Sequence, residues 1–126
     1  MNAKGLLFWG AVAAGLAVIL GAYGAHDLHD QIDPERLITF RKGVTYQMHH
    51  ALGLMLIGGL LFRFPDAKGL LWAGRLLLMG ILLFSGGLYL LVFTGVKAFA
   101  WLTPIGGFCF IFGWGTLAWT AKKELD

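Results

Sequence analysis

Charged side chains are scarce in this sequence. They make up only 13% of its 126 residues, whereas a soluble domain carries about 25%. Apolar residues account for 58%, and the mean hydropathy is +0.73. A water-soluble fold of this length leaves much of its surface exposed and could not hide so much apolar area. The composition therefore predicts a single domain embedded in lipid.

Cysteine pairs and basic runs are also missing. The single Cys109 excludes a disulfide framework. The net charge is +3, but the ten basic residues are scattered singly or in pairs and form no basic stripe of the kind that binds nucleic acid. A small basic excess is common in proteins that anchor on anionic lipid headgroups. We therefore expect membrane lipids, and no nucleic acid, as partners.

Long apolar segments are what the sequence does contain. They cover about 5–25, 44–62, 69–94 and 98–121. A helix needs roughly 20 apolar residues to cross the hydrocarbon core of a bilayer. None of the segments alternates apolar and polar residues, as the strands of a membrane barrel do. The sequence predicts an all-α integral membrane protein, a compact four-transmembrane-helix bundle that forms one domain.

The one long polar segment lies between the first two apolar segments. Asp33-Pro34-Glu35 is a typical helix start, with Asp as the N-cap, Pro at the first helical position and Glu near the positive end of the helix dipole. Apolar and charged residues then mix over about 34–43. This mixture predicts a short interfacial helix that lies on the lipid headgroups.

The distribution of Lys and Arg predicts the orientation. Four spans bring both termini to one side, together with Lys4, Arg63, Lys68, Lys122, Lys123 and, if its side chain reaches back, Arg75. The other side has Arg36, Arg41, Lys42 and Lys97. The positive-inside rule then places both termini in the cytoplasm. We expect a multi-pass protein of the cell membrane.

Small residues recur one helical turn apart, as in Gly10-x-x-x-Ala14 and Ala17-x-x-x-Gly21. Such helix faces allow two backbones to approach closely in lipid. They fit a tight bundle or a homo-oligomer, and the sequence leaves both open.

Polar residues gather where the topology brings four segment ends to one membrane face, opposite the termini. Tyr46 and His50 are four residues apart and share a helix face. Thr103 and the glycines that follow it leave backbone N–H groups open to an anion at a helix start. We interpret this cluster as an outward-facing polar pocket that binds a ligand, or as hydrogen bonds that hold the bundle. Its members are His26, Tyr46, Gln47, His50, Ser85, Tyr89, Thr103, Gly106 and Gly107.

A metal or catalytic site has less support. No CxxC, HxxxH or HExxH spacing occurs, and His26 and His50 are the only metal-ligand candidates. No carboxylate lies within an apolar segment, and no pair of base and nucleophile can be assigned. No catalytic residue is therefore predicted, and the cofactor stays open.

Four motifs, in order along the chain, closely resemble the DUF 423 family. They are Leu20–His26, Gly43–Gln47 with His50, Leu83–Tyr89, and Thr103–Gly107 with Gly113 and Trp114. The resemblance implies a small four-helix membrane protein of the bacterial inner membrane, with relatives in eukaryotes, and supplies no activity. It places His26 and His50, but not His29 and His49, at histidine positions of the family, which often has Ser at the position of Gly87.

Three functions are compatible with these features. The leading one is a non-enzymatic membrane protein whose outward-facing pocket binds a small ligand or a lipid headgroup, or which serves as an accessory subunit. A transporter or channel component would have to act as an oligomer, because four helices without an inverted repeat or an intramembrane acid offer little to couple to transport. The third is a metal or redox protein built on His26 and His50.

Overall fold

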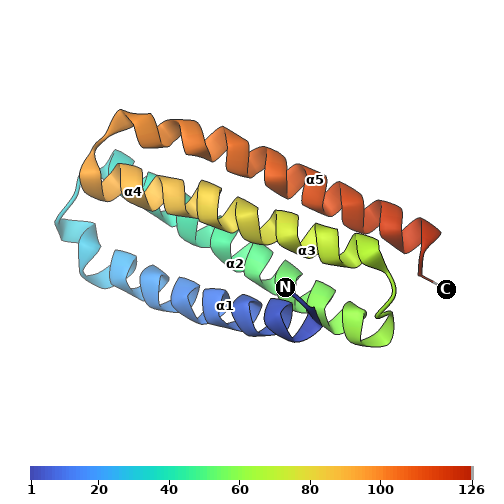
Figure 1. Cartoon of the computed structure of the whole chain (residues 1–126). Helices are drawn as coiled ribbons and strands as arrows, with labels where there is room; N and C mark the ends of the chain where they lie inside the picture. The colour runs from blue at the N-terminus through green and yellow to red at the C-terminus, as the bar shows by residue number, and fades with distance from the viewer. Residues whose placement is uncertain (126) are drawn as a thin grey trace.

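Four antiparallel helical segments make up the protein in the computed structural model, which describes residues 1–125 (Figure 1). The first is α1 (Ala3–His26) and the second is α2 (Pro34–Arg63). The third is a continuous rod of α3 (Lys68–Gly80), the π-helical turn η2 (Ile81–Ser85) and α4 (Gly86–Thr94). The fourth is α5 (Leu102–Lys123). Two short 3-10 turns, η1 (Leu28–Asp30) and η3 (Lys97–Trp101), belong to the connections.

Three segments of the described chain are long and apolar enough to cross a membrane: α1, the rod Lys68–Thr94 and the segment Lys97–Lys123. The all-helical membrane fold predicted from the sequence is thus confirmed. The α2 helix is longer than any of them but less apolar, because it contains charged residues such as Arg41 and Lys42 and polar residues such as Gln47 and His50. The side chains of Gln47 and His50 are buried, at 5% exposure each. Gln47 and His50 therefore face other helices, whereas the neighbouring His49 is exposed.

The ends of α2 and α4 follow from local sequence. Asp33 is the N-cap of α2, where its side chain accepts a hydrogen bond from the backbone N–H of Arg36 at 2.8 Å, and Pro34 occupies the first helical position. Gly95 ends α4 in the left-handed conformation, with φ of 70°, which favours glycine because it has no side chain to clash.

The interfacial helix expected over about 34–43 is not a separate element. These residues are helical, but they continue without a break into the rest of α2. Leu37 and Phe40 are buried, and Phe40 packs against Val92 of α4 and beside Gly24 of α1. Burial of these apolar side chains between helices outweighs their placement on headgroups, so the segment forms the first turns of α2 within the bundle.

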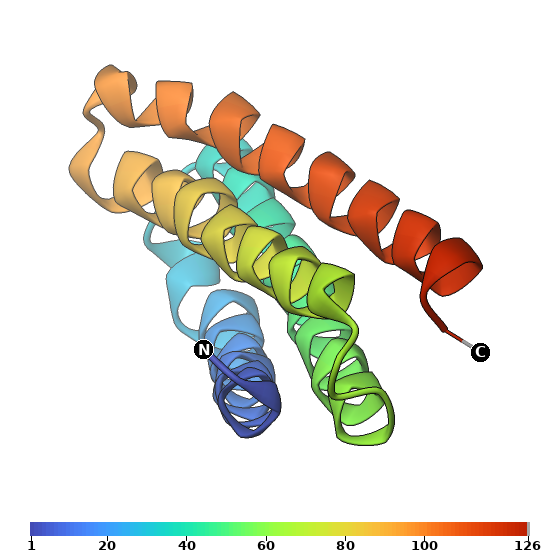
Figure 2. The same ribbon diagram turned by 45° about the vertical axis from the view of Figure 1, so that its right-hand side comes forward.

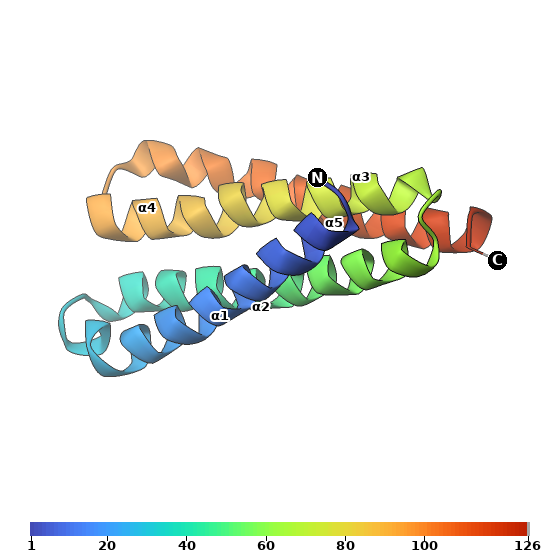
Figure 3. The same cartoon turned by 60° about the horizontal axis from the view of Figure 1, so that its bottom comes forward.

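The helices pack in chain order: α1 against α2, α2 against the rod, and the rod against α5. Figure 2 shows α1 and α5 at opposite edges of this arrangement, and Figure 3 shows α1 crossing α2 at an angle. Glycines allow the close approaches. A Cβ atom at Gly10 would lie 2.9 Å from the Ala51 carbonyl oxygen, and one at Gly58 would lie 2.9 Å from the Leu7 nitrogen. These small residues serve packing within the bundle.

Two apolar clusters fill the interior. The larger lies toward the termini and includes the fully enclosed side chains of Leu6, Leu54, Ile57, Leu70 and Leu77. The smaller, with Leu28, Phe40 and Val92, lies at the opposite end. The buried polar residues of α2, Gln47 and His50, lie between the two clusters.

Candidate functional site

The polar side chains of α2 lie halfway along the bundle. His50 is 16 residues beyond Pro34, about 24 Å along the helix. Its ring stacks on Phe110 at the middle of Lys97–Lys123, and Gln47 is bonded to Ala13 near the middle of α1. The sequence predicted a cluster at the outer mouth. The structure places these residues deeper, because α2 begins at Pro34, about ten residues before the expected span.

Gln47, Ser85 and Tyr89 make hydrogen bonds between helices inside the bundle. The Gln47 amide donates to the Ala13 carbonyl oxygen at 2.8 Å, and the Tyr89 hydroxyl donates to Gln47 Oε1 at 2.7 Å. Ser85 Oγ, on the π-helical turn, donates to the Gly43 carbonyl oxygen at 2.6 Å. Together these bonds tie α1, α2 and the rod. Three of the predicted site residues thus have partners inside the protein and hold the bundle.

Tyr46, His50 and Gly107 line a separate groove between α2 and α5, with a volume of about 600 Å³. Aromatic and aliphatic side chains form most of its wall. The full lining is Tyr46, His49, His50, Phe84, Gly107, Phe110, Ile111 and Trp114. We call this the α2–α5 groove.

His50 is held rigidly in the α2–α5 groove. Its Nδ1 lies 2.6 Å from the Tyr46 carbonyl oxygen, which can only accept, so Nδ1 carries the proton. The Phe110 ring stacks on the imidazole with a centroid distance of 3.5 Å and an angle of 9°. In a neutral imidazole of this tautomer, Nε2 is a hydrogen-bond acceptor. Within residues 1–125, Nε2 has no hydrogen-bond partner.

The remaining predicted residues lie elsewhere. His26 is exposed at the end of α1. His26 is close in sequence to Gly24, which packs beside Phe40 of α2, whereas His50 precedes Ala51, which packs beside Gly10 of α1. His26 and His50 are therefore separated by about 20 Å along the helices. The structure therefore does not bring the two metal-ligand candidates together. In the part of the chain that it describes, no three His, Cys, Asp or Glu side chains are grouped to hold a metal ion.

The start of α5 is filled by protein rather than open to an anion. A Cβ atom at Gly106 would collide with the backbone of Phe84. Thr103 Oγ1 is enclosed, and it is the one buried side-chain oxygen or nitrogen in residues 1–125 without a hydrogen-bond partner. Gly106 thus serves close packing of α5 on the rod, and only Gly107 of this pair faces the α2–α5 groove.

Sequence reasoning missed the aromatic wall of the groove, which includes Phe84, Phe110 and Trp114. Aromatic residues in apolar segments are usual for lipid-facing and packing positions. The available signal was spacing, because Gly107, Phe110, Ile111 and Trp114 recur at three- and four-residue intervals and so share one face of α5. That this face meets His50 depends on the position of α5 beside α2, which no local pattern reveals.

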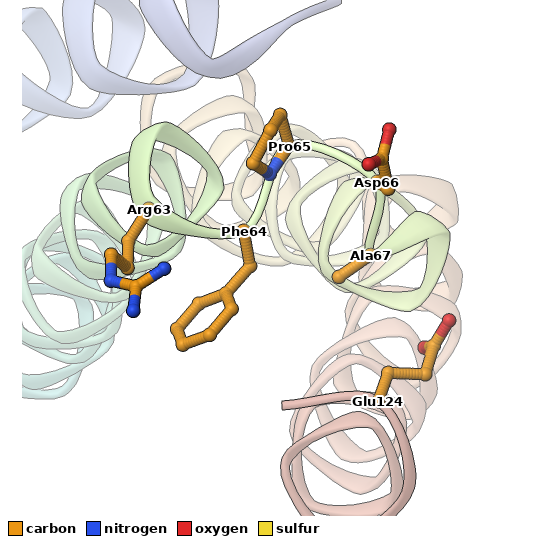
Figure 4. Close-up of a pocket in the computed structure, with 6 residues that line it drawn as sticks. All are labelled: Arg63, Phe64, Pro65, Asp66, Ala67 and Glu124. Carbon is orange, nitrogen blue, oxygen red and sulfur yellow. The ribbon is translucent and has the colours of Figure 1, made fainter. Parts of the chain in front are cut away.

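Two other hollows offer less chemistry. The one in Figure 4, of about 400 Å³, lies at the turn between α2 and α3, where the Arg63 guanidinium sits over the Phe64 ring. Its charged side chains, Arg63, Asp66 and Glu124, lie at the terminal end of the bundle. A further groove of about 300 Å³ between α1 and the rod is almost entirely apolar, and its Gln47 and Tyr89 are already bonded to each other.

Apolar helices long enough to span a bilayer, with polar side chains such as Gln47, His50 and Ser85 buried between helices, define a multi-pass integral membrane protein. A family model described as "Protein of unknown function (DUF423)" matches residues 20–107. The chain belongs to this family, as its motifs indicated.

Relatives match along almost the whole chain. The UPF0382 membrane protein of Staphylococcus epidermidis (strain ATCC 12228 / FDA PCI 1200) is 44% identical over 95% of this chain and 97% of its own. The UPF0382 membrane protein YwdK of Bacillus subtilis (strain 168) is 40% identical over 97% of this chain and 99% of its own. No solved structure matches this chain.

Proposed function

We propose that this protein is a non-enzymatic membrane protein that takes a small apolar molecule from the bilayer into the α2–α5 groove. The observation that carries the proposal is His50, which is 5% exposed, lines the groove and has an unpartnered Nε2 in the described chain. A polar side chain in lipid is costly unless it is paired, and such residues commonly mark functional sites. The same ligand site fits an accessory subunit of a larger membrane complex.

The depth of the groove supports a bilayer-soluble ligand over a lipid headgroup. The hydrocarbon core is about 30 Å thick, so a site at half depth lies about 15 Å from either headgroup layer. A bundle centred in the bilayer would hold His50 and Phe110 at that level, because both lie midway along their helices. The proposed site therefore differs from the outward-facing headgroup pocket expected from the sequence, because the ligand would enter the α2–α5 groove from among the acyl chains.

Photolabelling tests the proposal. A phenyl diazirine dissolved in vesicles that contain the protein will insert wherever it resides on irradiation, and mass spectrometry locates the adducts. Trp119 is 65% exposed and Trp114, in the groove, is 39% exposed. If the groove binds the probe, Trp114 is labelled more than Trp119. If labelling follows exposure, Trp119 carries more label than Trp114 and the proposal fails.

Two glycines on α5 provide a matched pair of variants. Gly107 lines the groove, and Gly107→Leu places a side chain in it. A Cβ at Gly115 would have no atom within 4 Å, so Gly115→Leu adds the same side chain at a free position outside the groove lining. We expect Gly107→Leu to abolish the excess label at Trp114 and Gly115→Leu to leave it unchanged. Equal labelling in both variants would contradict binding in the groove.

We also propose that both termini face the cytoplasm in the inner membrane of the cell. The distribution of charge supports this orientation, because Lys4, Arg63, Lys68, Lys122 and Lys123 belong to the end of the bundle that carries both termini (Figure 1). Arg75 fits the same side, since its guanidinium lies over the ring of Trp72, one turn nearer that end.

A further inference from the structure

The α2–α5 groove differs from a plain apolar cleft because the His50 imidazole is fixed in its wall. His50 Nδ1 is committed to the Tyr46 carbonyl oxygen, and the Phe110 ring covers one face of the imidazole. The ring edge that carries Nε2 is therefore the part left for a ligand. Thr103 Oγ1 is the one fully enclosed polar side-chain atom in residues 1–125 that lacks a hydrogen-bond partner. His50 Nε2 also lacks a partner there, so it is not fully enclosed.

The rings around His50 set the shape of the site. Tyr46, His50 and Phe110 lie nearly parallel, with angles of 9° between Tyr46 and His50 and 16° between Tyr46 and Phe110. Phe84 packs at 4.7 Å from the Tyr46 ring centroid, and Trp114 lies 5.8 Å from the His50 ring centroid. Aromatic walls of this kind favour a flat ring, which packs in offset or edge-to-face contact with them.

From these observations we propose that the ligand is a bilayer-soluble ring compound that carries a hydroxyl group, of the phenol or quinol class, and that the hydroxyl donates a hydrogen bond to His50 Nε2. This inference rests on the proposed function of the groove. A hydroxyl donor satisfies His50 Nε2, an acceptor that the described chain leaves unpaired in a groove walled mostly by aromatic side chains. The acyl chain of a lipid would leave Nε2 unpaired.

Two probes separate recognition of the hydroxyl from simple partitioning. β-Naphthol has a flat ring and a hydroxyl donor, and its methyl ether has the same ring without the donor. Each is titrated into protein in lipid nanodiscs, with NMR of isotope-labelled histidine side chains as the readout. We expect β-naphthol to shift the Nε2 signal of His50 saturably. The ether should bind about tenfold more weakly, since one hydrogen bond is lost.

Variants assign the effect to His50. His50→Phe removes the acceptor and keeps an aromatic ring, and His49 in the same groove still reports binding by NMR. This variant should lower the affinity for β-naphthol about tenfold and leave that for the ether unchanged. His29→Phe is the matched control, because His29 is exposed on η1, where it contacts Asp30. Gly107→Leu keeps His50 and blocks the groove, so it tests the site even where His50→Phe fails to fold.

The outcomes distinguish the two proposals. If both probes bind equally and Gly107→Leu blocks both, the groove binds apolar molecules without hydroxyl recognition, and this inference is overturned while the proposed function stands. A Nε2 signal already displaced by a metal or haem that copurifies would overturn it as well. If neither probe nor the diazirine label reaches the groove, both proposals fail.

Discussion

At the scale of single residues, the polar side chains of α2 have two different roles. Gln47 is fully engaged, as donor to Ala13 and acceptor from Tyr89. His50 has one nitrogen engaged and one open to the groove. The two residues are three apart, so they lie near each other on the helix, yet one faces α1 and α4 and the other faces α5.

The bond between Gln47 and Tyr89 can be measured by a double-mutant cycle. Gln47→Leu, Tyr89→Phe and the double variant would be unfolded reversibly in detergent or bicelles. Interhelical hydrogen bonds of this kind contribute about 0.6 kcal/mol on average and at most about 1.7 kcal/mol. We expect a coupling free energy in that range. Strictly additive effects of the two substitutions would show that the bond does not contribute to stability.

The enclosed hydroxyl of Thr103 offers a second test. A Cβ atom at Gly87 would lie 3.7 Å from Thr103 Oγ1 and 3.0 Å from Leu102 Cβ. Gly87→Ser and Gly87→Ala meet the same crowding, but the serine hydroxyl can also bond to Thr103. We expect the serine variant to be more stable than the alanine variant by about 1 kcal/mol, measured by thermal unfolding in detergent.

Thr103→Val supplies the control for this comparison. It removes the orphan hydroxyl, so the difference between serine and alanine at position 87 should disappear in that background. A difference that persists would mean that the gain comes from elsewhere.

At the scale of helices, glycine decides how closely α5 approaches the rod. Gly106 and Gly107 are adjacent, but they have opposite surroundings. A Cβ at Gly106 would collide with the Phe84 backbone, whereas the nearest atom to one at Gly107 is Phe84 Cδ2 at 4.0 Å. Gly106 thus packs tightly against the rod, whereas Gly107 lines the open α2–α5 groove.

Alanine at each of these positions should therefore have different effects. Gly106→Ala forces α5 away from η2 and is expected to destabilise the protein by about 1–3 kcal/mol, the usual cost of overpacking. Gly107→Ala is expected to change stability by less than about 0.5 kcal/mol. Unfolding of the two variants side by side gives the comparison. Equal losses would mean that α5 does not pack on Phe84 as described.

At the scale of the whole molecule, the distribution of charge between the two ends predicts the orientation in the membrane. Asn2 lies at the terminal end, and Asp30 lies in the connection between α1 and α2 at the opposite end. In a Cys109→Ser background, Asn2→Cys and Asp30→Cys give one thiol on each side. A membrane-impermeant maleimide applied to intact cells should label Asp30→Cys and leave Asn2→Cys unlabelled. The reverse result would contradict cytoplasmic termini.

The sequence by itself determined the membrane fold of this protein. Apolar runs, the Asp33-Pro34 helix start and the small residues of α1 predicted helices and close packing, because each depends on local composition, capping or spacing. The family motifs also marked Gln47, His50, Ser85 and Tyr89 as distinctive, without separating their roles.

Only the tertiary structure decided where the polar residues lie and what each contacts. The mixed polarity of segment 34–43 is typical of an interfacial helix, but burial of Phe40 against Val92 makes this segment part of α2 and places His50 near the middle of the helix. The α2–α5 groove forms because α5 packs on the rod and meets α2 through side chains such as Phe110 and Trp114. Contacts between helices distant in the sequence fix both features, and no local pattern encodes them.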